Sequence, residues 1–283
     1  MKCRKLSVVM PAYNEGCNIF NNLMTVSACL KEFCPEYEVV AVNDGSKDQT
    51  EAEIVRAAHE DKHIKAVSYK DNQGKGHAIK EGVDAASGDV IAFLDADLDI
   101  APSHLKLYLQ EMEKQNADIV IGSKMHKDSK LEYPAARRFV SFCYYVILKI
   151  LFRLNVKDTQ TGIKVFRADA VKRIIGMVKT HGYAYDIEIL AVAARFGYKI
   201  IEQPVELKYT RRESFGRIRL KDILKMASDT FRIFFWLKVK KRYDAEIKSR
   251  RVTDEKGIDY YTGTGNQRLH TGSNSAPSTA RLP

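Results

Sequence analysis

The sequence has few of the residues that mark secreted or metal-stapled proteins. Its 283 residues include five cysteines, an odd number, and no two of them form a Cys-x-x-Cys pair. This pattern indicates reduced thiols in a cytosolic compartment, and it argues against a disulfide framework or a zinc site. The seven histidines show no metal-ligand spacing either.

Long hydrophobic runs are also missing. The charged start Met1–Lys5 is followed by only a few apolar or small residues before Pro11, fewer than a signal peptide needs. The most apolar stretches, within 139–152 and 231–237, are too short or too charged to span a bilayer. We therefore expect neither secretion nor a membrane-spanning helix.

Positive charge is in excess, with 46 Lys and Arg against 36 Asp and Glu and a formal net charge of +10. This balance suits nucleotides, phosphates, nucleic acid or an anionic membrane face, and charge alone does not choose among them. The basic residues do not line a helix as in a DNA-binding basic region, and the chain carries no nucleic-acid-binding signature. A non-catalytic basic binding protein stays a distant alternative.

Strand-forming and helix-forming segments alternate along the first half of the chain. Strands are expected at 6–10, 37–42, 64–69, 90–94 and 117–122, with helices at about 18–33 and 48–59 and a third that the Gly-rich turn 72–76 opens and that runs to residue 86. This alternation predicts an α/β fold with a mostly parallel central sheet that helices cover on both faces. Ligands of such sheets bind beyond the carboxyl ends of the strands.

The second half is less regular. Helices are expected at 137–154, 168–177 and 185–196, and strands at 163–166, 199–201 and 205–209. A long basic and aromatic helix is expected at about 218–243. From residue 244 the composition shifts to Ser, Thr, Gly and Asn, which is typical of a disordered tail. We therefore divide the chain into a catalytic domain at 1–217, which includes the apolar helix 137–154, a basic amphipathic helix at 218–243 and a tail at 244–283.

Three polar clusters follow expected strands, at 11–15, 43–46 and 95–99. They should meet at one rim of the sheet and form a site. In an extended chain, Asp95, Asp97 and Asp99 would share one face, where three carboxylates repel one another. A hard divalent cation, Mg²⁺ or Mn²⁺, would neutralise Asp95 and Asp97. Asp99 is a ligand, a substrate contact or a helix N-cap.

Other motifs leave two interpretations open. Asp44 suits a base or ribose hydroxyl, but Asn43–Ser46 also suits a plain turn. The run Gly74–Gly76 is either a small phosphate cradle or an ordinary helix entry. Basic clusters at 133–138 and 210–219 are solvated surface or contacts for an anionic lipid head group.

The order and spacing of these motifs carry a resemblance. Val8–Glu15, Val42–Thr50, Gly74–Gly76 and Asp95–Leu98 resemble an inverting family 2 glycosyltransferase of the GT-A fold. Farther on, Ile121–Lys124, Arg137–Arg138, Asp158–Arg167 and Tyr185–Glu188 resemble the polyprenyl-phosphate sugar synthases, which include dolichyl-phosphate mannose synthase and dolichyl-phosphate β-glucosyltransferase. The similarity covers about residues 5–243, and the run 158–164 is closer to the glucosyl branch.

The resemblance implies a nucleotide-diphospho-sugar transferase fold and a metal-dependent hexosyltransferase. The enzyme would move glucose, or next mannose, from UDP-glucose or GDP-mannose to polyprenyl or dolichyl phosphate with inversion, for cell-envelope or protein glycosylation. Mg²⁺ or Mn²⁺ would be the cofactor. A family 2 transferase acting on a saccharide hydroxyl is the nearer alternative.

The resemblance also implies roles for matched positions. The nucleotide sugar would be held by Pro11, Tyr13, Glu15, Asp44, Lys75 and Asp95. The metal would be held by Asp95 and Asp97, and the catalytic residues would be Asp97, Arg138 and Asp158. Phosphate contacts would be Lys124, Arg137, Arg212 and Arg219, and candidate sugar contacts Asp99, Gln160, Asp186 and Glu188. Mannose synthases tend to carry Gln at the position of Asp99 and Arg at that of Lys124, and lysine cannot make a bidentate guanidinium contact.

Two segments predict how such a chain reaches a lipid. Residues 139–154 and 231–243 combine aromatic and aliphatic residues with lysines and arginines. This composition is typical of helices that lie in a membrane interface. We expect peripheral attachment to the cytosolic face of a membrane, or docking of the same surface on a membrane-spanning partner subunit.

Overall fold

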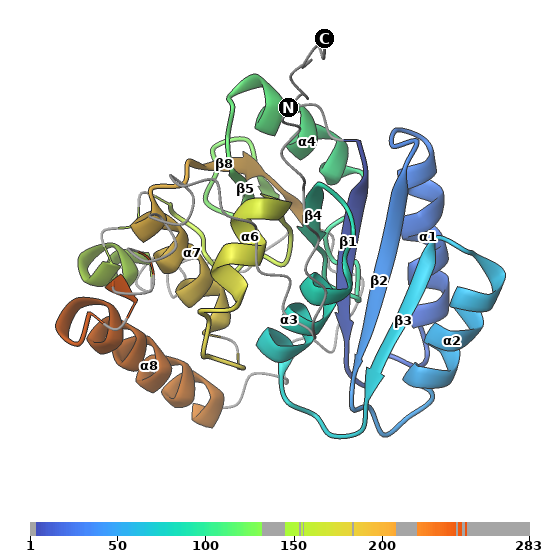
Figure 1. Ribbon diagram of the computed structural model, residues 1–283, viewed down its shortest axis with the longest axis horizontal. Coiled ribbons are helices and arrows are strands. Elements are labelled where there is room, and N and C mark those ends of the chain that lie inside the picture. The colour runs from blue at the N-terminus through green and yellow to red at the C-terminus, as the bar shows by residue number, and fades with distance from the viewer. Residues whose placement is uncertain are drawn as a thin grey trace, which may run out of the picture.

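A seven-stranded sheet forms the centre of the molecule (Figure 1). The computed structural model describes residues 4–131, 145–152, 154, 156–182, 184–207, 220–241, 243, 244 and 247. The strands of the sheet are β1 (Leu6–Ala12), β2 (Tyr37–Asp44), β3 (Ile64–Tyr69), β4 (Val90–Phe93), β5 (Ile119–Ser123), β7 (Lys164–Arg167) and β8 (Ile200–Pro204). Their order is β3-β2-β1-β4-β7-β5-β8, and only β7 runs antiparallel to its neighbours. The predicted mostly parallel α/β sheet is therefore confirmed.

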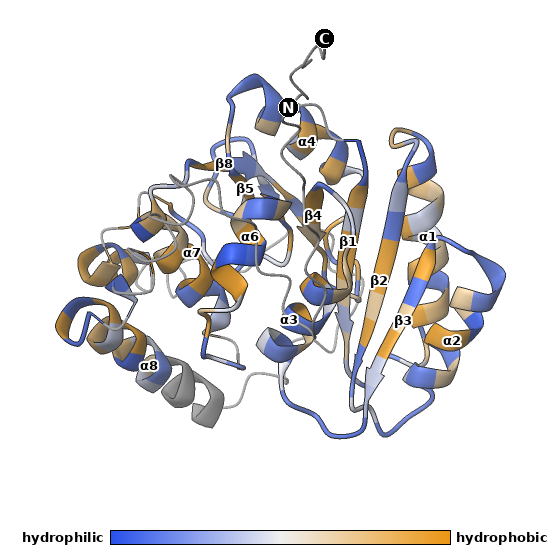
Figure 2. Cartoon of the chain, viewed as in Figure 1, coloured by the Kyte–Doolittle hydropathy of each residue, from blue (hydrophilic) through white to orange (hydrophobic). Residues whose placement is uncertain are grey.

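Alternation of side chains along the strands divides the core into two layers. On β1, Val8 and Met10 face one layer while Val9 faces the other. Such continuous apolar strands are typical of a sheet that is buried on both faces, and β1 and β2 are largely orange in Figure 2. The first layer is covered by α1 (Ile19–Lys31), α2 (Thr50–Glu60) and α4 (His104–Lys114). The second is covered by α3 (Lys75–Ala85), α6 (Ala168–Ile175) and α7 (Tyr185–Phe196).

Two elements were not predicted from the sequence. One is α4, which the sequence analysis raised only through Asp99 as a candidate N-cap. Its N-cap is Ser103, so that interpretation of Asp99 is wrong. The buried residues of α4, Leu105, Tyr108 and Met112, recur at helical spacing. The other is β6 (Lys130–Leu131), which pairs in parallel with β9 (Glu206–Leu207), a strand that lies within the expected range 205–209. A strand of two residues such as β6 lies below the length at which a sequence pattern can be recognised.

The helix 145–152 and the C-terminal helices pack in the core layer that contains α7. Residues 145–152 are helical, α8 spans Leu220–Phe234, and a π-helical turn, η2, continues it over Phe235–Val239. The rings of Phe152 and Phe234 lie 6.2 Å apart, edge to face, and join the two helices. Ile233 and Leu237 are buried in the same core layer as α7. None of the helices in the described ranges is long and apolar enough to cross a membrane.

The predicted boundaries are only partly covered by these residues. The first part of the helix expected at 137–154 and nearly all of the tail expected at 244–283 lie outside the described residues. Within that tail, Ile247 is described and packs into the core beside Tyr243.

Candidate active site

The carboxyl ends of β1, β2 and β4 meet at one rim, because these strands are parallel neighbours. Pro11 pairs with Val42 at the end of β1, and the polar segments 11–15, 43–46 and 95–99 follow the three strands. The rim predicted from the strand order is therefore present. Tyr13 is 46% exposed on it.

The segment after β4 crowds negative charges. It forms a turn in which Leu98 adopts a positive φ of 53° and its N–H donates to the Asp95 carbonyl at 3.2 Å. Burial and the negative charges of Asp95 and Asp99 raise the pKa of Asp97 to about 6. Glu15 adds a smaller effect of the same sign. The repulsion expected from the sequence is thus concentrated on Asp97.

Lys75 is the cation that faces this cluster. It is the first residue of α3, and its Nζ pairs with Oδ1 of Asp95. Burial alone would lower the pKa of Lys75, but the negative charges of Asp95 and Asp186 outweigh burial and raise it. One ammonium therefore serves several carboxylates, which leaves negative charge for another cation to neutralise.

The residues around Asp97 fit a divalent cation. Carboxylate oxygens are the ligands that Mg²⁺ and Mn²⁺ prefer, and Mg²⁺ in particular is usually held by one or two carboxylates plus substrate phosphates. No group of three or more Asp, Glu, His or Cys residues in the described ranges is arranged to hold a metal by itself. Asp95 and Asp97 would therefore hold the ion in part and leave positions for phosphate oxygens and water.

Asp44 lies at the same rim but is already satisfied by neighbouring groups. It is 3% exposed and accepts hydrogen bonds from the Tyr69 hydroxyl at 2.8 Å and the Asn72 side chain at 2.9 Å. The backbone N–H groups of Gln73 and Gly74 donate to it at 2.8 and 3.0 Å. Its carboxylate therefore organises the turn that leads into α3.

The same contacts decide between the two interpretations of Gly74–Gly76. The N–H of Gly74 donates to Asp44, and that of Gly76 donates to the His181 carbonyl at 2.8 Å. Because these two amides are already bonded within the protein, the contacts favour the helix-entry interpretation of the segment. Lys75 keeps its place beside Asp95.

A second polar group lies next to the first. Asp158 is 8% exposed, and its Oδ2 lies 3.2 Å from the Nζ of Lys124. It accepts hydrogen bonds from the Lys124 N–H at 2.9 Å, the Thr161 hydroxyl at 2.6 Å and the Gln160 N–H at 3.1 Å. Burial alone would raise the pKa of Asp158, but Lys124 and these donors hold it below its usual value. Asp158 is therefore a fixed anion.

Gly162 joins the two groups. A β-carbon added to it would lie 2.0 Å from Oδ2 of Asp95, so the backbone of Gly162 rests directly on that carboxylate. A side chain has no room at this position. The segment after β4 and the segment before β7 therefore form one continuous site.

The two acids at the start of α7 lie behind the rim. Oδ1 of Asp186 accepts a 2.5 Å hydrogen bond from the buried Lys164 ammonium. Glu188 is fully buried and accepts from the N–H groups of Lys179 and Thr180 at 2.9 and 2.8 Å and from the Tyr243 hydroxyl at 2.5 Å. Glu188 therefore holds the loop before α7 and the side chain of Tyr243 in place.

Four of the expected site residues lie outside the described residues: the catalytic candidate Arg138 and the phosphate contacts Arg137, Arg212 and Arg219. Conversely, Lys164 was missed by the sequence analysis. It opens β7 in a run of apolar residues, and a lysine inside a buried strand is the signal that could have drawn attention to it.

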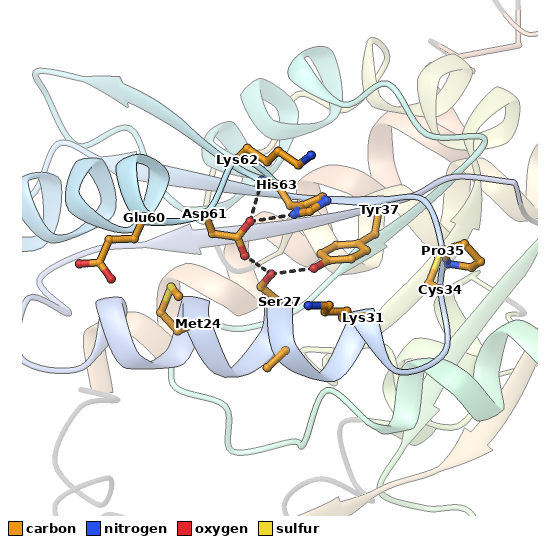
Figure 3. Close-up of a pocket in the computed structure, with 11 residues that line it drawn as sticks. Met24, Ser27, Lys31, Cys34, Pro35, Tyr37, Glu60, Asp61, Lys62 and His63 are labelled. Carbon is orange, nitrogen blue, oxygen red and sulfur yellow. Dashed lines mark hydrogen bonds and ion pairs between the residues drawn. The ribbon is translucent and has the colours of Figure 1, made fainter.

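The hollow in Figure 3 belongs to another part of the molecule. It lies at the amino ends of the strands, between α1 and the starts of β2 and β3, and has a volume of about 520 Å³. Its polar groups bond to one another: Ser27 lies between Tyr37 and Asp61, and Asp61 accepts from His63 at 2.8 Å. The rings of Tyr37 and His63 stack 4.5 Å apart. At the end of the sheet opposite to the rim, the polar side chains of the hollow therefore satisfy one another's hydrogen bonds.

Similarity to known proteins agrees with this geometry. Residues 7–175 match the model of glycosyl transferase family 2. A glycosyltransferase of Haloferax volcanii is 30% identical over 90% of this chain, which spans only 40% of that relative. A dolichyl-phosphate beta-glucosyltransferase of Trichomonas vaginalis is 31% identical, over 83% of this chain and 74% of the relative. An undecaprenyl-phosphate mannosyltransferase of Micrococcus luteus is 27% identical, over 71% of this chain and 82% of the relative.

Solved structures share the fold. Glucosyl-3-phosphoglycerate synthase of Mycobacterium tuberculosis, crystallised with Mn²⁺, UDP and phosphoglyceric acid, superimposes with a TM-score of 0.63. The alignment covers 82% of this chain and 78% of that protein at 19% identity. The architecture is therefore that of the GT-A glycosyltransferases, and, with the family match over more than half of its length, the chain belongs to glycosyl transferase family 2.

Proposed function

We propose that this protein transfers a hexose from a nucleotide sugar to polyprenyl or dolichyl phosphate, with inversion at the anomeric carbon. Glucose from UDP-glucose is the favoured donor sugar, and mannose from GDP-mannose is second. The names of the relatives from Trichomonas vaginalis and Micrococcus luteus support a polyprenyl-phosphate acceptor. The product would serve cell-envelope or protein glycosylation.

The observation that carries the proposal is that two groups of site residues, one rich in carboxylates and one with a lysine beside a carboxylate, lie in contact at one rim. The half around Asp95, Asp97 and Lys75 is rich in carboxylates and suits the diphosphate of a donor with its metal. The half around Asp158 and Lys124 places a lysine beside a fixed anion. Gly162 brings them into contact, so a donor and an anionic acceptor would meet between them.

The chemistry asks little of a general base. A phosphomonoester has its second pKa near about 6, so at neutral pH the acceptor oxygen is already a nucleophile. The larger demands are to hold two anions together and to stabilise the charge on the departing diphosphate. Lys75 and Lys124 supply positive charge on the two sides, and direct attack from the face opposite the diphosphate would invert the anomeric carbon.

Asp95 and Asp97 would hold a divalent cation, Mg²⁺ or Mn²⁺. The bound ion would neutralise charge on the diphosphate oxygens as the bond to the sugar breaks. Lys75 remains next to Asp95 and keeps that carboxylate oriented.

A saccharide hydroxyl is a poorer acceptor for this site. Attack by a neutral hydroxyl needs a base that can take its proton. Asp158, which lies in the acceptor half, has a pKa below its usual value and is bound by Lys124 and Thr161. These contacts make Asp158 a weak base, which favours an acceptor that is already ionised.

The helices at the C-terminal side support a peripheral place on a membrane. Ile147 and Ile150 in the helix 145–152, and Phe231 in α8, are exposed, Ile150 to 73%. Phe235 and Val239 in η2 are exposed as well. Lys149, Arg232, Lys238 and Lys240 lie among them, and basic residues next to apolar ones suit an anionic lipid surface. We place this surface on the cytosolic leaflet, alone or with a membrane-spanning partner subunit.

The proposal is tested with labelled donors. The purified protein is incubated with Mn²⁺, detergent-dispersed polyprenyl phosphate, and radiolabelled UDP-glucose or GDP-mannose, and the lipid is extracted into organic solvent. We expect label in the organic phase from one donor, lost on chelation of the metal. Label that stays in water with both donors, in the presence of a saccharide acceptor that becomes glycosylated, would instead support the hydroxyl-acceptor alternative.

Membrane attachment has a separate test. The protein should float with vesicles that contain anionic lipid at low salt and dissociate at high salt, because each basic residue near the surface adds about 1 kcal/mol. Phe235→Ser should weaken flotation without changing transfer to detergent-dispersed acceptor. A wild-type protein that stays at the bottom at low salt would rule out direct attachment.

A further inference from the structure

Lys164, the first residue of β7, has a side chain that is only 1% exposed. Its ammonium donates to two acceptors, Oδ1 of Asp186 at 2.5 Å and the backbone carbonyl of Thr161 at 2.6 Å. A buried charge persists only where such partners replace the lost hydration. The two acceptors belong to different parts of the active site.

On one side, Lys164 holds the segment that carries Asp158. The residue whose carbonyl it binds, Thr161, also donates its hydroxyl to Oδ2 of Asp158 at 2.6 Å. The next residue, Gly162, rests against Asp95. A shift of the Thr161 carbonyl would therefore move Asp158 and the wall of the Asp95 site together.

On the other side, Asp186 connects α7 to the beginning of α3. Its negative charge acts on Lys75, which pairs with Asp95. The preceding residue, Tyr185, is buried, and its Cβ lies so near Gly76 that a β-carbon there would be only 2.8 Å away. Asp186 is thus fixed in place between Lys164 and the donor half of the site.

We propose that Lys164 and Asp186 form a positioning pair that keeps the Asp158 segment and the Lys75–Asp95 pair in register for sugar transfer. Neither residue needs to touch the substrate. Replacement of a buried ion pair by apolar residues of similar volume is often neutral or stabilising, so stability alone is a weak reason for an ion pair at this place. The hydrogen bond to the Thr161 carbonyl, which an apolar residue cannot make, supplies the reason instead.

Two variants separate positioning from folding. Lys164→Met removes the ammonium but leaves Asp186 buried without its hydrogen-bonded cation, which also lowers stability. The double variant Lys164→Met with Asp186→Leu removes both charges, and we expect it to recover much of that stability. It does not restore the bond to the Thr161 carbonyl.

Glu38→Gln is the matched control. Glu38 is a buried carboxylate in the same sheet, bound by Lys5 at 3.0 Å, Lys65 at 2.7 Å and Ser7 at 2.6 Å. It pairs with Ser7 near the amino ends of β1 and β2, at the end of the strands opposite to the rim. Its loss should destabilise the fold without moving Asp158.

The measurements are kcat per folded molecule and hydrogen exchange of peptides that cover 157–163. Both Lys164 variants should lose about 100-fold in kcat, because a displacement of about 1 Å has an effect of that order. The N–H of Gln160, which donates to Asp158, should exchange faster in both variants and stay unchanged in Glu38→Gln. A double variant with wild-type kcat or wild-type exchange at 157–163 would overturn the proposal.

The inference rests on the proposed function only for the kcat measurement. Hydrogen exchange needs no substrate, so it reports on the segment whatever the acceptor is. If the wild-type protein transfers no hexose to polyprenyl phosphate, the proposed function fails. Faster exchange at 157–163 in the double variant would then still support the positioning pair, and unchanged exchange would refute it.

Discussion

Two loops at the same rim, 43–46 after β2 and 95–99 after β4, use aspartate in opposite ways. Asp44 in the first loop accepts hydrogen bonds from Tyr69, Asn72 and the backbone that follows. Asp97 in the second loop is surrounded by negative charge, and its own pKa is raised to about 6. The first carboxylate is satisfied by the protein, whereas the second is only partly compensated, by the Asp99 N–H at 3.3 Å and the charge of Lys75.

The role of an aspartate at a strand end therefore depends on segments that are distant in sequence. The donors around Asp44 come from the end of β3 and the turn before α3, about 25 to 30 residues farther along the chain. Around Asp97 the neighbours are mostly acids, with Lys75 as the nearby cation. A free-energy cost is therefore left at Asp97, and a bound cation can remove it.

The largest expected effect follows from a substitution in the loop 95–99. Asp97→Asn should lower metal-dependent transfer by about 1000-fold, because several kcal/mol of charge stabilisation at the diphosphate would be lost. Its melting temperature should stay the same or rise, since one of the crowded charges is gone. Activity is measured at saturating donor and metal. Wild-type activity in this variant would remove Asp97 from the candidate metal site.

A substitution in the loop 43–46 should instead lower the stability of the fold. Asp44→Ala leaves the hydroxyl of Tyr69 and the N–H groups of Gln73 and Gly74 without their acceptor. We expect the free energy of unfolding to fall by about 3 kcal/mol, at about 1–3 kcal/mol for each unsatisfied buried donor with partial relaxation. Chemical denaturation measures this loss.

Tyr69→Phe provides the control for Asp44, because it removes one donor and leaves the carboxylate in place. It should lower the free energy of unfolding by about 1 kcal/mol. If Asp44→Ala keeps wild-type stability and loses nucleotide affinity instead, the structural interpretation of Asp44 is wrong and the nucleotide contact expected from the family resemblance stands.

Two glycines, one in the loop 43–46 and one against the loop 95–99, provide a second test of the difference between the loops. A β-carbon at Gly162 would lie 2.0 Å from Oδ2 of Asp95, so Gly162→Ala should displace that carboxylate and lower kcat by about 100-fold. Gly45 has a φ of 61°, and its β-carbon would lie 2.4 Å from the backbone nitrogen of Asn72. Gly45→Ala should cost stability, by about 1–3 kcal/mol for the strained backbone alone. Equal losses of kcat per folded molecule in both variants would contradict the separation of roles.

Much of this arrangement could be predicted from the sequence. The apolar strands, their alternation with helices and the polar residues at their ends are enough to place Pro11, Asp44 and Asp95 at one rim. The antiparallel insertion of β7 between β4 and β5 could not be predicted, because a short apolar run does not reveal its direction.

The partners of each site residue could not be predicted either. Pairs such as Lys164 with Asp186 and Lys124 with Asp158 join residues 22 and 34 positions apart. They depend on how α7 and the segment before β7 pack on the sheet. Local composition carries no record of such packing, and the sequence analysis therefore found the acids without finding the lysine that holds two of their segments together.

The last expected effect is a pH dependence of opposite sign at two acids, the half-buried Asp97 and the buried Glu38. The pKa of Asp97 in the folded protein, about 6, exceeds its value near about 4 in the unfolded chain. Its contribution to stability is therefore present below about pH 4 and is lost as the pH rises through about 6. Because Asp97→Asn mimics the protonated acid, it should become more stable than the wild type over this interval.

The pKa of Glu38 is shifted in the opposite direction. Burial alone would raise this pKa, but Lys65, Ser7 and Ser87 hold it far below its usual value. The stability advantage of the wild type over Glu38→Gln should consequently be full above about pH 4.3 and fade as the pH falls. Chemical denaturation of the wild type and both variants from pH 3.5 to 7, with divalent cations chelated, measures the two differences side by side. A stability difference between Asp97→Asn and the wild type that does not change with pH would mean that Asp95, Asp99 and Glu15 do not crowd Asp97. The contrast between the two loops would then lose its electrostatic basis.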